Sequence, residues 1–361
     1  MTQIKSKGYG VKNSIFSTLK PIDFERAEPK GDEVLIDVLY CGVCHSDLHQ
    51  VKNDWGNSVY PCIPGHEIIG RVLQAGTNVT KFKTGDIVGV GCMIDSCGHC
   101  HSCNEGLEQY CEGPKSWTAT YNGPMKPDGS NTYGGYSNNL VVKESFVLRI
   151  PESLDISRAA PILCAGITTY SPMKHWNVKQ GDKVGIVGVG GLGHMAVKLA
   201  KALGAEVTAI TTLKEKQEAA KALGAHQVLL SKDEDAIKKA ELSFDFILVT
   251  IPDPFDINEY IDLLKRDGTL VTVGLLGPYK KPTVNMNVAM HRRNISGSLI
   301  GGIQETQEVL DFCAEHNILP DVEMIPIQEI NDAFDKMQKG DVRFRYVIDM
   351  QSLKDEMKAE A

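Results

Sequence analysis

A glycine-rich turn in the middle of the chain limits the possible folds more than any other feature. Residues 188–193 read Gly-Val-Gly-Gly-Leu-Gly and fit the pattern G-x-G-x-x-G. An apolar run at 183–187 precedes the turn, and residues 191–203 place apolar side chains at helical spacing. Strand, tight turn and amphipathic helix in this order predict a dinucleotide site with the pyrophosphate at the helix start. The residues expected there are Gly188, Gly190, Gly191, Leu192 and Gly193. The alternative is a glycine-rich turn without a ligand.

The pattern of strand-like and helical stretches changes at about residue 150. From residue 157 onward, strand-like runs at 183–187, 206–210, 244–250 and 269–273 alternate with helical stretches. This alternation predicts a doubly wound parallel sheet that closes near residue 295. Before residue 150, short β-rich runs at 33–40, 86–90 and 136–142 are broken by Gly, Pro and Asn, which predicts an irregular all-β unit. A length of 361 residues also favours two domains.

Charge and hydropathy argue against several classes of protein. The chain has 38 Lys and Arg against 46 Asp and Glu, a net charge of −8, which argues against binding to nucleic acid or to anionic lipid. No apolar run has the length of a signal peptide or a membrane span, so a cytoplasmic protein is expected. In that reducing compartment, the ten cysteines would not form a framework of disulfides, so cysteines that cluster in the sequence are expected to be metal ligands or reactive thiols. The charged tail at 352–361 is expected to be loosely held.

Four of the cysteines form a compact array. Cys97, Cys100, Cys103 and Cys111 follow the spacing C-x2-C-x2-C-x7-C, and four such thiolates can close a tetrahedron around Zn²⁺. A ferredoxin run would place its fourth Cys after three residues and follow it with Pro, whereas Glu112 follows here. Four unligated thiols are the remaining alternative. A zinc saturated by sulfur would be structural, with His99 and His101 as bystanders.

A second group of ligand-type residues occupies the segments 44–49 and 65–67. A catalytic zinc takes three protein ligands and leaves one position open, and Cys44 and His66 could supply two of them. Asp47 is the nearby candidate for an acidic partner of the ligand imidazole. Spacing alone does not choose the third ligand, and the candidates are Cys62, Cys92, Cys164 and Cys313. Each of these could instead be a small buried apolar residue.

The end of the second strand of the parallel sheet indicates the cofactor. NAD sites place an acidic residue there for the ribose hydroxyl, but this chain has Thr211 and Thr212, followed by Lys214 and Lys216. Hydroxyls and ammonium groups suit the 2′-phosphate of NADP better. The alternative is that the lysines are ordinary solvated residues, and Glu215 lies between them.

Taken together, the motifs resemble the zinc-dependent medium-chain alcohol dehydrogenases, and within them the cinnamyl alcohol dehydrogenase group. The resemblance covers nearly the whole chain and rests on segments 42–47, 64–67, 163–166, 188–193, 297–301 and 343–347 and on the four-cysteine array. It implies an α/β protein with a GroES-like β-rich catalytic domain, residues 1–156 with 297–361 returning to it. A Rossmann NADP-binding domain would span 157–296, with the active site in the cleft between the domains. It also implies two zinc ions per chain, NADP(H), and a homodimer joined through residues 294–300.

The resemblance also implies roles for individual residues. It makes Cys164 the third ligand of the catalytic zinc, with Glu67 near or transiently on the metal, while Ser46 and His49 carry the proton to water. Asp47 and Glu67 complete the catalytic set. Cofactor contacts are expected from His45, Thr211, Thr212, Lys216, Ser298 and Ile300. A substrate pocket is expected from Trp55, Cys92, Trp117, Leu275, Leu299 and Ile300. Leu213 and Trp55 depart from the residues common in the family, a third hydroxyl and a smaller aliphatic side chain.

These features favour one function over two others. We expect an NADP(H)-preferring zinc alcohol dehydrogenase or aldehyde reductase of broad specificity, acting on aromatic substrates such as cinnamyl or benzyl and on medium aliphatic ones. A catalytically silent NADP-binding protein with only a structural zinc would have lost the ligands that this chain keeps. A zinc-ribbon nucleic-acid binder would need a basic face, but Asp95, Glu105 and Glu108 lie around the four cysteines.

Overall fold

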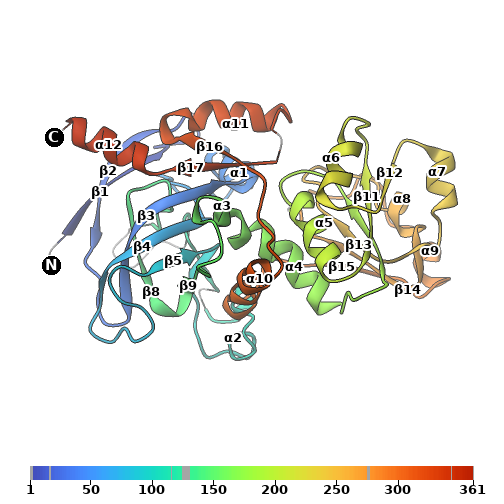
Figure 1. The fold of residues 1–361 in the computed structure, drawn as a ribbon, viewed down its shortest axis with the longest axis horizontal. Coiled ribbons are helices and arrows are strands. Elements are labelled where there is room, and N and C mark those ends of the chain that lie inside the picture. Colours follow the sequence, from blue (N-terminus) through green and yellow to red (C-terminus); the bar gives the residue numbers. More distant parts are fainter. Residues whose placement is uncertain are drawn as a thin grey trace. The chain divides into compact units, whose positions relative to one another are not determined.

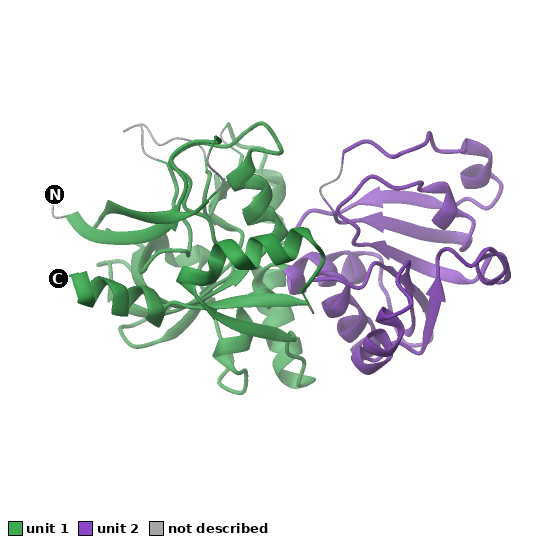
Figure 2. Ribbon diagram, turned by 90° about the horizontal axis from the view of Figure 1, so that it is seen from above, with its two compact units in different colours: residues 1–164, 301–361 green, residues 165–300 purple. Residues whose placement is uncertain are grey.

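The computed structural model describes residues 3–15, 18–114, 116–123, 131–274, 277–342 and 344–360. The chain forms two compact units, unit 1 (residues 1–164 and 301–361) and unit 2 (residues 165–300), shown in Figure 2. Residues 156–163 group with unit 1 because α3 (Ile156–Ala159) and the 3-10 turn η3 (Ala160–Leu163) pack on its strands. Cys164 is therefore the last residue of the first segment of unit 1. Leu275, which is expected in the substrate pocket, and residue 343, the first of the segment 343–347, lie outside the described residues.

A parallel sheet forms the centre of unit 2 (Figure 1). Six strands are described in it, in the order β12-β11-β10-β13-β14-β15, and every neighbouring pair is parallel. Numbered along the chain this order is 3-2-1-4-5-6, the arrangement of dinucleotide-binding folds. The strands are β10 (Lys183–Val187), β11 (Glu206–Thr211), β12 (Gln227–Leu230), β13 (Phe244–Val249), β14 (Leu264–Thr272) and β15 (Asn294–Gly297). The predicted doubly wound sheet is confirmed.

The helices described in unit 2 alternate with its strands, as the sequence predicts. They are α4 (Ala165–His175), α5 (Gly193–Ala202), α6 (Lys216–Leu223), α7 (Glu234–Lys239), α8 (Asn258–Ile261) and α9 (Asn285–Ala289). Met195, Ala196 and Leu199 of α5 are fully buried, as the apolar spacing predicts. The pentapeptide Lys-Ala-Leu-Gly-Ala occurs at the ends of α5 and α6, and its glycines have φ of 85° at Gly204 and 113° at Gly224. Glycine is favoured there because this left-handed conformation ends a helix.

Unit 1 is built on a mainly antiparallel sheet. Within the described ranges it has the order β16-β17-β3-β4-β5-β9, with β8 also paired to β3, while β1 pairs with β2 and β6 with β7. The strands are β1 (Gln3–Gly10), β2 (Lys20–Ala27), β3 (Glu33–Val43), β4 (Ile68–Ala75), β5 (Ile87–Val90), β6 (Met93–Asp95), β7 (Thr118–Ala119), β8 (Asn139–Lys143), β9 (Leu148–Arg149), β16 (Val322–Pro326) and β17 (Arg345–Asp349). Fully buried Ile36, Val38, Ile68 and Val72 of β3 and β4 form part of its core.

Short helices connect and cover the strands of unit 1. They are α1 (His45–Lys52), α2 (His101–Asn104), η1 (Glu108–Tyr110), η2 (Glu144–Phe146), α10 (Ile303–Glu315), η4 (Ile327–Glu329), α11 (Ile330–Gln338) and α12 (Gln351–Glu360). Over the described part of the chain, no helix has the length and apolarity needed to cross a membrane.

The expectation that the C-terminal tail is loosely held is wrong. Residues 351–360 form the helix α12, whose Leu353 is fully buried. Glu356 accepts a hydrogen bond of 2.8 Å from the Tyr9 hydroxyl, and Glu360 pairs with Lys7. The charged composition of the tail suggested a solvated segment. The partners of its carboxylates could not be recognised because they lie on β1, at the opposite end of the sequence.

Candidate metal and cofactor sites

Four ligand-type side chains meet in the interior of unit 1. Cys44, His66, Glu67 and Cys164 are buried, and one ligand atom of each lies within 4.8 Å of the others. Cys44 joins β3 to α1, His66 and Glu67 precede β4, and Cys164 follows η3. His66 Nε2 lies 3.3 Å from Cys164 Sγ. The structure therefore brings together the four residues to which the family resemblance gave metal roles; they are called the buried cluster below.

The donor atoms of the buried cluster fit a zinc ion. Two cysteines, a histidine and a carboxylate are the ligand types that zinc prefers. Both carboxylate oxygens of Glu67 are buried and accept no hydrogen bond from any described residue. A buried carboxylate without such bonds is costly unless cations compensate it; the Arg345 guanidinium, 3.0 Å from Oε1, is one such cation, and a metal ion at the cluster would be a second. A hydrogen bond shared by the two thiols lowers the pKa of Cys44 and raises that of Cys164, so the pair favours one thiolate, on Cys44, in the absence of a metal.

Arg345 supplies a positive charge beside Glu67. Its Nη2 lies 3.0 Å from Glu67 Oε1, and its Nη1 donates a hydrogen bond of 3.1 Å to the carbonyl of Val43. Burial raises the pKa of Glu67 to about 7, and the nearby Arg345 charge opposes that rise. Glycine at position 42 leaves room for the Glu67 carboxylate, because a Cβ there would lie 1.9 Å from Glu67 Oε2. Sequence reasoning quoted the segment around Arg345 but gave this residue no role.

Asp47 of α1 orients the imidazole of His66. Its carboxylate is fully buried, and Oδ1 accepts hydrogen bonds from His66 Nδ1 at 3.0 Å and from the Gly65 amide at 3.1 Å. Oδ2 accepts from the Cys44 amide at 2.9 Å and from the Tyr136 hydroxyl at 3.2 Å. With Nδ1 engaged in this way, Nε2 is the nitrogen directed to the buried cluster. Asp47 thus lies where an acidic partner of a ligand histidine is needed.

Helix α1 carries two further polar residues, Ser46 and His49, which follow Cys44 in the chain. Ser46 Oγ is 3.6 Å from Cys44 Sγ. His49 Nδ1 is 2.8 Å from Asp54 Oδ2, and its ring centroid is 5.4 Å from that of Trp55. Sequence reasoning missed Asp54. An acidic residue at the end of the helix that carries His49 was the available signal.

The residues expected in the substrate pocket are distributed over both units. Trp55, Cys92 and Trp117 belong to unit 1, Leu299 belongs to unit 2, and all four are half-buried. Cys92 Sγ donates a long hydrogen bond of 3.8 Å to the carbonyl of Leu163, the neighbour of Cys164 in the chain, and Cys92 is not one of the four members of the buried cluster. The other two candidates for a third ligand, Cys62 and Cys313, are fully buried and lie outside that group.

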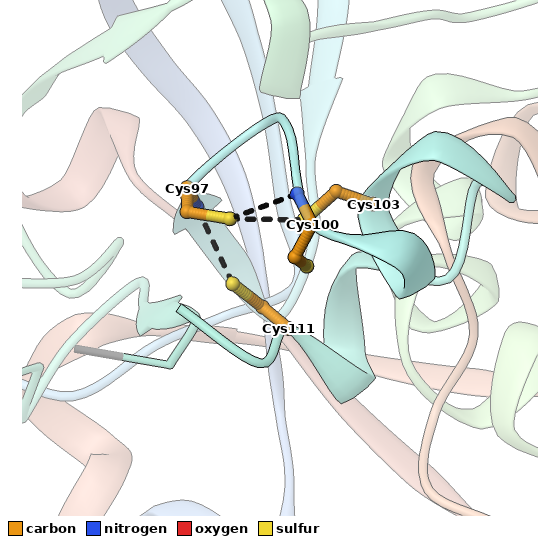
Figure 3. A group of neighbouring side chains, drawn as sticks. All are labelled: Cys97, Cys100, Cys103 and Cys111. Atoms are coloured by element: carbon orange, nitrogen blue, oxygen red, sulfur yellow. Dashed lines mark hydrogen bonds between the residues drawn. The ribbon is translucent and has the colours of Figure 1, made fainter. Parts of the chain in front are cut away.

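The second metal-type group is the four-cysteine lobe, residues 97–113 (Figure 3). The Sγ atoms of Cys97, Cys100, Cys103 and Cys111 lie within 4.8 Å of one another. Backbone amides point at the sulfurs at 3.4 Å, from Cys97 to Cys111, from Cys100 to Cys97 and from Glu112 to Cys100. Bonds from the Cys103 and Glu112 amides lower the pKa of Cys100 to about 6. Four sulfurs with amide support fit a closed zinc site without an open position.

The histidines of this lobe engage other partners. His99 Nδ1 faces the carbonyl of Cys97 at 2.6 Å, and the exposed His101 pairs with Glu105 at 3.4 Å. Neither belongs to the group of four sulfurs.

The glycine turn of unit 2 has the geometry of a phosphate-binding turn. Gly188 has a φ of 91°, which favours glycine. A Cβ at Gly193, the first residue of α5, would lie 1.9 Å from the carbonyl oxygen of Gly188, so the turn and the helix touch through backbone alone. A Cβ at Gly190 would meet nothing within 4 Å, so this side of the turn is open. The arrangement leaves room for a pyrophosphate at the start of α5.

Lys216 links the next helix to this turn. Its Nζ donates a hydrogen bond of 3.2 Å to the carbonyl of Val189, which places an ammonium group beside the glycine turn. Thr211 ends β11 and its hydroxyl accepts from the Leu213 amide at 3.2 Å, while Thr212 and Lys214 are exposed. The tip of β11 therefore presents hydroxyl groups and positive charge.

The remaining expected cofactor residues lie at the end of unit 2 and on α1. Ser298 follows β15 and its amide donates to the carbonyl of Thr272 at 3.1 Å. Ile300 has a φ of 37°, an unusual conformation for a β-branched residue. His45 of α1 is half-buried, and burial lowers its pKa.

Comparison with known proteins identifies the family. Residues 30–152 match the family described as alcohol dehydrogenase GroES-like domain, and residues 191–315 match the family described as zinc-binding dehydrogenase. The chain is 53% identical to the aldehyde reductase YahK of Escherichia coli over 93% of its length and 96% of that protein. The chain belongs to the zinc-binding alcohol dehydrogenases. It is also 50% identical to NADP-dependent alcohol dehydrogenase C 1 of Mycolicibacterium smegmatis, over 89% of this chain and 91% of that one.

Solved structures of other alcohol dehydrogenases share the fold. The cinnamyl alcohol dehydrogenase of Sorghum bicolor is 42% identical, with a TM-score of 0.91 over 96% of this chain and 98% of its own. The CAD protein of Helicobacter pylori, solved with NADP(H), is 41% identical, with a TM-score of 0.90 over 97% of this chain and 99% of its own. The predicted family, fold class and enzyme class are therefore confirmed, and this alcohol dehydrogenase is an oxidoreductase.

Proposed function

We propose that this alcohol dehydrogenase interconverts aldehydes and alcohols with NADP(H), acting mainly as an aldehyde reductase. Its substrates would be aromatic, such as cinnamyl or benzyl compounds, or medium aliphatic. The observation that carries the proposal is the complete buried cluster of Cys44, His66, Glu67 and Cys164, oriented by Asp47. A silent NADP-binding protein would have no need to keep this cluster and its carboxylate partner.

The buried cluster suits a catalytic zinc and the four-cysteine lobe a structural one. Cys44, His66 and Cys164 would be the three ligands of the catalytic ion, with Glu67 close by. When bound, such a zinc acts as a Lewis acid on the substrate oxygen and lowers the pKa of an alcohol. Asp47 holds Nε2 of His66 toward the metal position, and Arg345 balances the charge of Glu67 at 3.0 Å.

Ser46 and His49 would move the proton between the substrate oxygen and water. The carboxylate of Asp54, 2.8 Å from His49 Nδ1, would orient the imidazole and leave Nε2 to exchange the proton. A bound nicotinamide would be the donor or acceptor of the hydride. In unit 1, Trp55, which lies beside His49, would form part of the apolar wall for the substrate with the thiol of Cys92 and with Trp117. Leu299 is the residue of unit 2 that the family resemblance adds to this set.

Thr211, Thr212 and Lys216 would bind the 2′-phosphate that distinguishes NADP from NAD. The position of Lys216 Nζ, 3.2 Å from the Val189 carbonyl, keeps its charge next to the glycine turn. Phosphate recognition by ammonium and hydroxyl groups needs no acidic residue, and 211–214 contains none. The NADP-dependent relative from Mycolicibacterium smegmatis supports this preference. His45, Ser298 and Ile300 would contact the rest of the cofactor.

The same proposal includes a homodimer and a reducing compartment. β15 is the edge strand of the unit 2 sheet, and an unpaired edge is a common site of pairing between copies. Exposed Val284, Met286 and Met290 precede that strand and would be covered in a dimer. Thiolate ligands stay reduced in the cytosol, which suits both metal-type groups. Light scattering of the purified protein measures the oligomeric state directly.

The deciding experiment measures zinc per chain and the oxidation of NADPH and NADH in parallel on cinnamaldehyde and benzaldehyde. We expect two zinc ions per chain and faster turnover with NADPH. One zinc and no turnover with either cofactor, from folded protein purified without chelators, would favour the silent-binder alternative. Lys216→Glu should weaken NADPH far more than NADH, and equal effects on both would remove Lys216 from the phosphate site.

A further inference from the structure

The four-cysteine lobe touches the start of α10 through backbone and one carboxylate. Glu108 Oε2 accepts a hydrogen bond of 3.0 Å from the Ile303 amide. A Cβ at Gly302 would lie 1.7 Å from the carbonyl oxygen of Gly106 and 2.8 Å from Glu108 Oε2. Glycine at position 302 therefore lets the two segments approach more closely than any other residue would allow.

Glu108 serves as the cap of α10. The N-cap residue Gly302 has no side chain of its own, so the carboxylate of Glu108 satisfies the first amide of the helix and places a negative charge at its positive end. One turn later, Gln307 exchanges two hydrogen bonds with the backbone of Arg149 of β9, at 2.9 and 3.0 Å. The beginning of α10 is thereby fixed to the lobe on one side and to the sheet of unit 1 on the other.

This contact lies where the chain returns from unit 2 to unit 1. Residue 301 is the first residue of the returning segment, and Ile300 is the last residue of unit 2. Two residues of chain span at most about 7 Å, so the position of Gly302 restricts that of Ile300. Ile300 also has a φ of 37°, a conformation that persists only where neighbouring structure imposes it.

We propose that Glu108 is a positioning residue for the cofactor. Its hydrogen bond fixes the start of α10 against the four-cysteine lobe, and through the short piece of chain between Ile300 and Ile303 it limits where residues 298–300 can lie. The inference rests on the proposed function, in which Ser298 and Ile300 contact NADP(H). The lobe is then more than a source of stability, because its order is transmitted through one carboxylate to residues at the cofactor.

The test compares Glu108→Ala and Glu108→Gln with the control Glu105→Ala in the zinc-loaded enzyme. Glu105 is a carboxylate of the same lobe that pairs with the exposed His101. In Glu108→Ala we expect amide exchange of residues 299–307 to become about tenfold faster, with the last turns of α10 unchanged. The dissociation constant for NADPH, from its fluorescence, should rise about fivefold because the contact segment is misplaced. Glu108→Gln keeps an acceptor oxygen and should lie between this variant and the wild type.

The readouts separate this inference from the proposed function. Zinc content should remain two per chain in every variant, and Glu105→Ala should behave as the wild type. Unchanged exchange in Glu108→Ala, or faster exchange with unchanged NADPH affinity, would overturn the positioning role. Loss of the lobe zinc in Glu108→Ala and Glu108→Gln would overturn it too, because Glu108 would then act by retaining metal. Failure of the wild type itself to bind NADPH would contradict the proposed function instead.

Discussion

The two metal-type groups of unit 1 are built in opposite ways. In the four-cysteine lobe the ligands lie within residues 97–111 and only Cys111 is buried, while amides of the same loop point at the sulfurs. In the buried cluster the ligands lie between residues 44 and 164, and all four are buried. Its electrostatic support comes from charged side chains, Asp47 and Arg345. A site that only has to close a loop can be local, whereas a site that must expose one open position to a substrate needs a framework from several segments.

The largest effect should come from removing one ligand of the buried cluster. Cys164→Ala should lower kcat at least about a thousandfold, because two protein ligands hold a Lewis-acid zinc poorly. One zinc per chain should remain, in the lobe, and circular dichroism should match the wild type. If this variant keeps its turnover, the buried cluster is not the site of a catalytic zinc.

Removing one sulfur ligand from the four-cysteine lobe should lower the stability of the protein more than its turnover. Cys103→Ser should lose the lobe zinc and lower the free energy of unfolding by about 3 kcal/mol, because metal binding contributes directly to folding. Below its lowered melting temperature, the variant should keep turnover within about an order of magnitude of the wild type. Urea unfolding together with zinc analysis measures both. A complete loss of activity at low temperature in a folded variant would show that the two groups are not independent.

A milder change sharpens the role of the charged partner. Asp47→Asn should reduce zinc affinity at the buried cluster, or kcat, by about 10- to 100-fold, since the amide no longer fixes the tautomer of His66. The lobe zinc serves as an internal control and should be retained. Metal titration of the variant under competition with a chelator gives the affinity, and an unchanged value would assign Asp47 a purely structural role.

The smallest expected effect concerns the rate of metal release. A bidentate chelator should remove the zinc of the buried cluster about tenfold faster than the zinc of the lobe, because an open coordination position lets the chelator bind before any protein ligand leaves. Activity should fall in step with the first zinc, while the melting temperature changes little. Loss of the first zinc without loss of activity would show that the lobe, and not the buried cluster, releases its zinc first.

The same contrast explains what could be predicted from the sequence. The spacing of four cysteines predicts the metal-type group of the lobe: Cys97, Cys100, Cys103 and Cys111. The glycine turn is recognised by its place between a predicted strand and a predicted helix. Cys164 could be chosen from four candidates only through the family resemblance, because no spacing rule connects it to Cys44. Asp54, Tyr136 and the pairing of Arg345 with Glu67 went unnoticed. The last two depend on segments that only the folded sheet brings together, as does the docking of α12 on β1.

The placement of Arg345 has a consequence for how the enzyme is made. During synthesis from the N-terminus, the lobe has its full set of thiols once residue 111 has left the ribosome, and a metal ion can be captured at that stage. The buried cluster has all its ligands only when residue 164 has emerged. The charge that balances Glu67 arrives with Arg345, after the whole of unit 2 has been translated. A ribosome stalled between residues 164 and 345 would therefore carry all four members of the buried cluster without the arginine that pairs with Glu67.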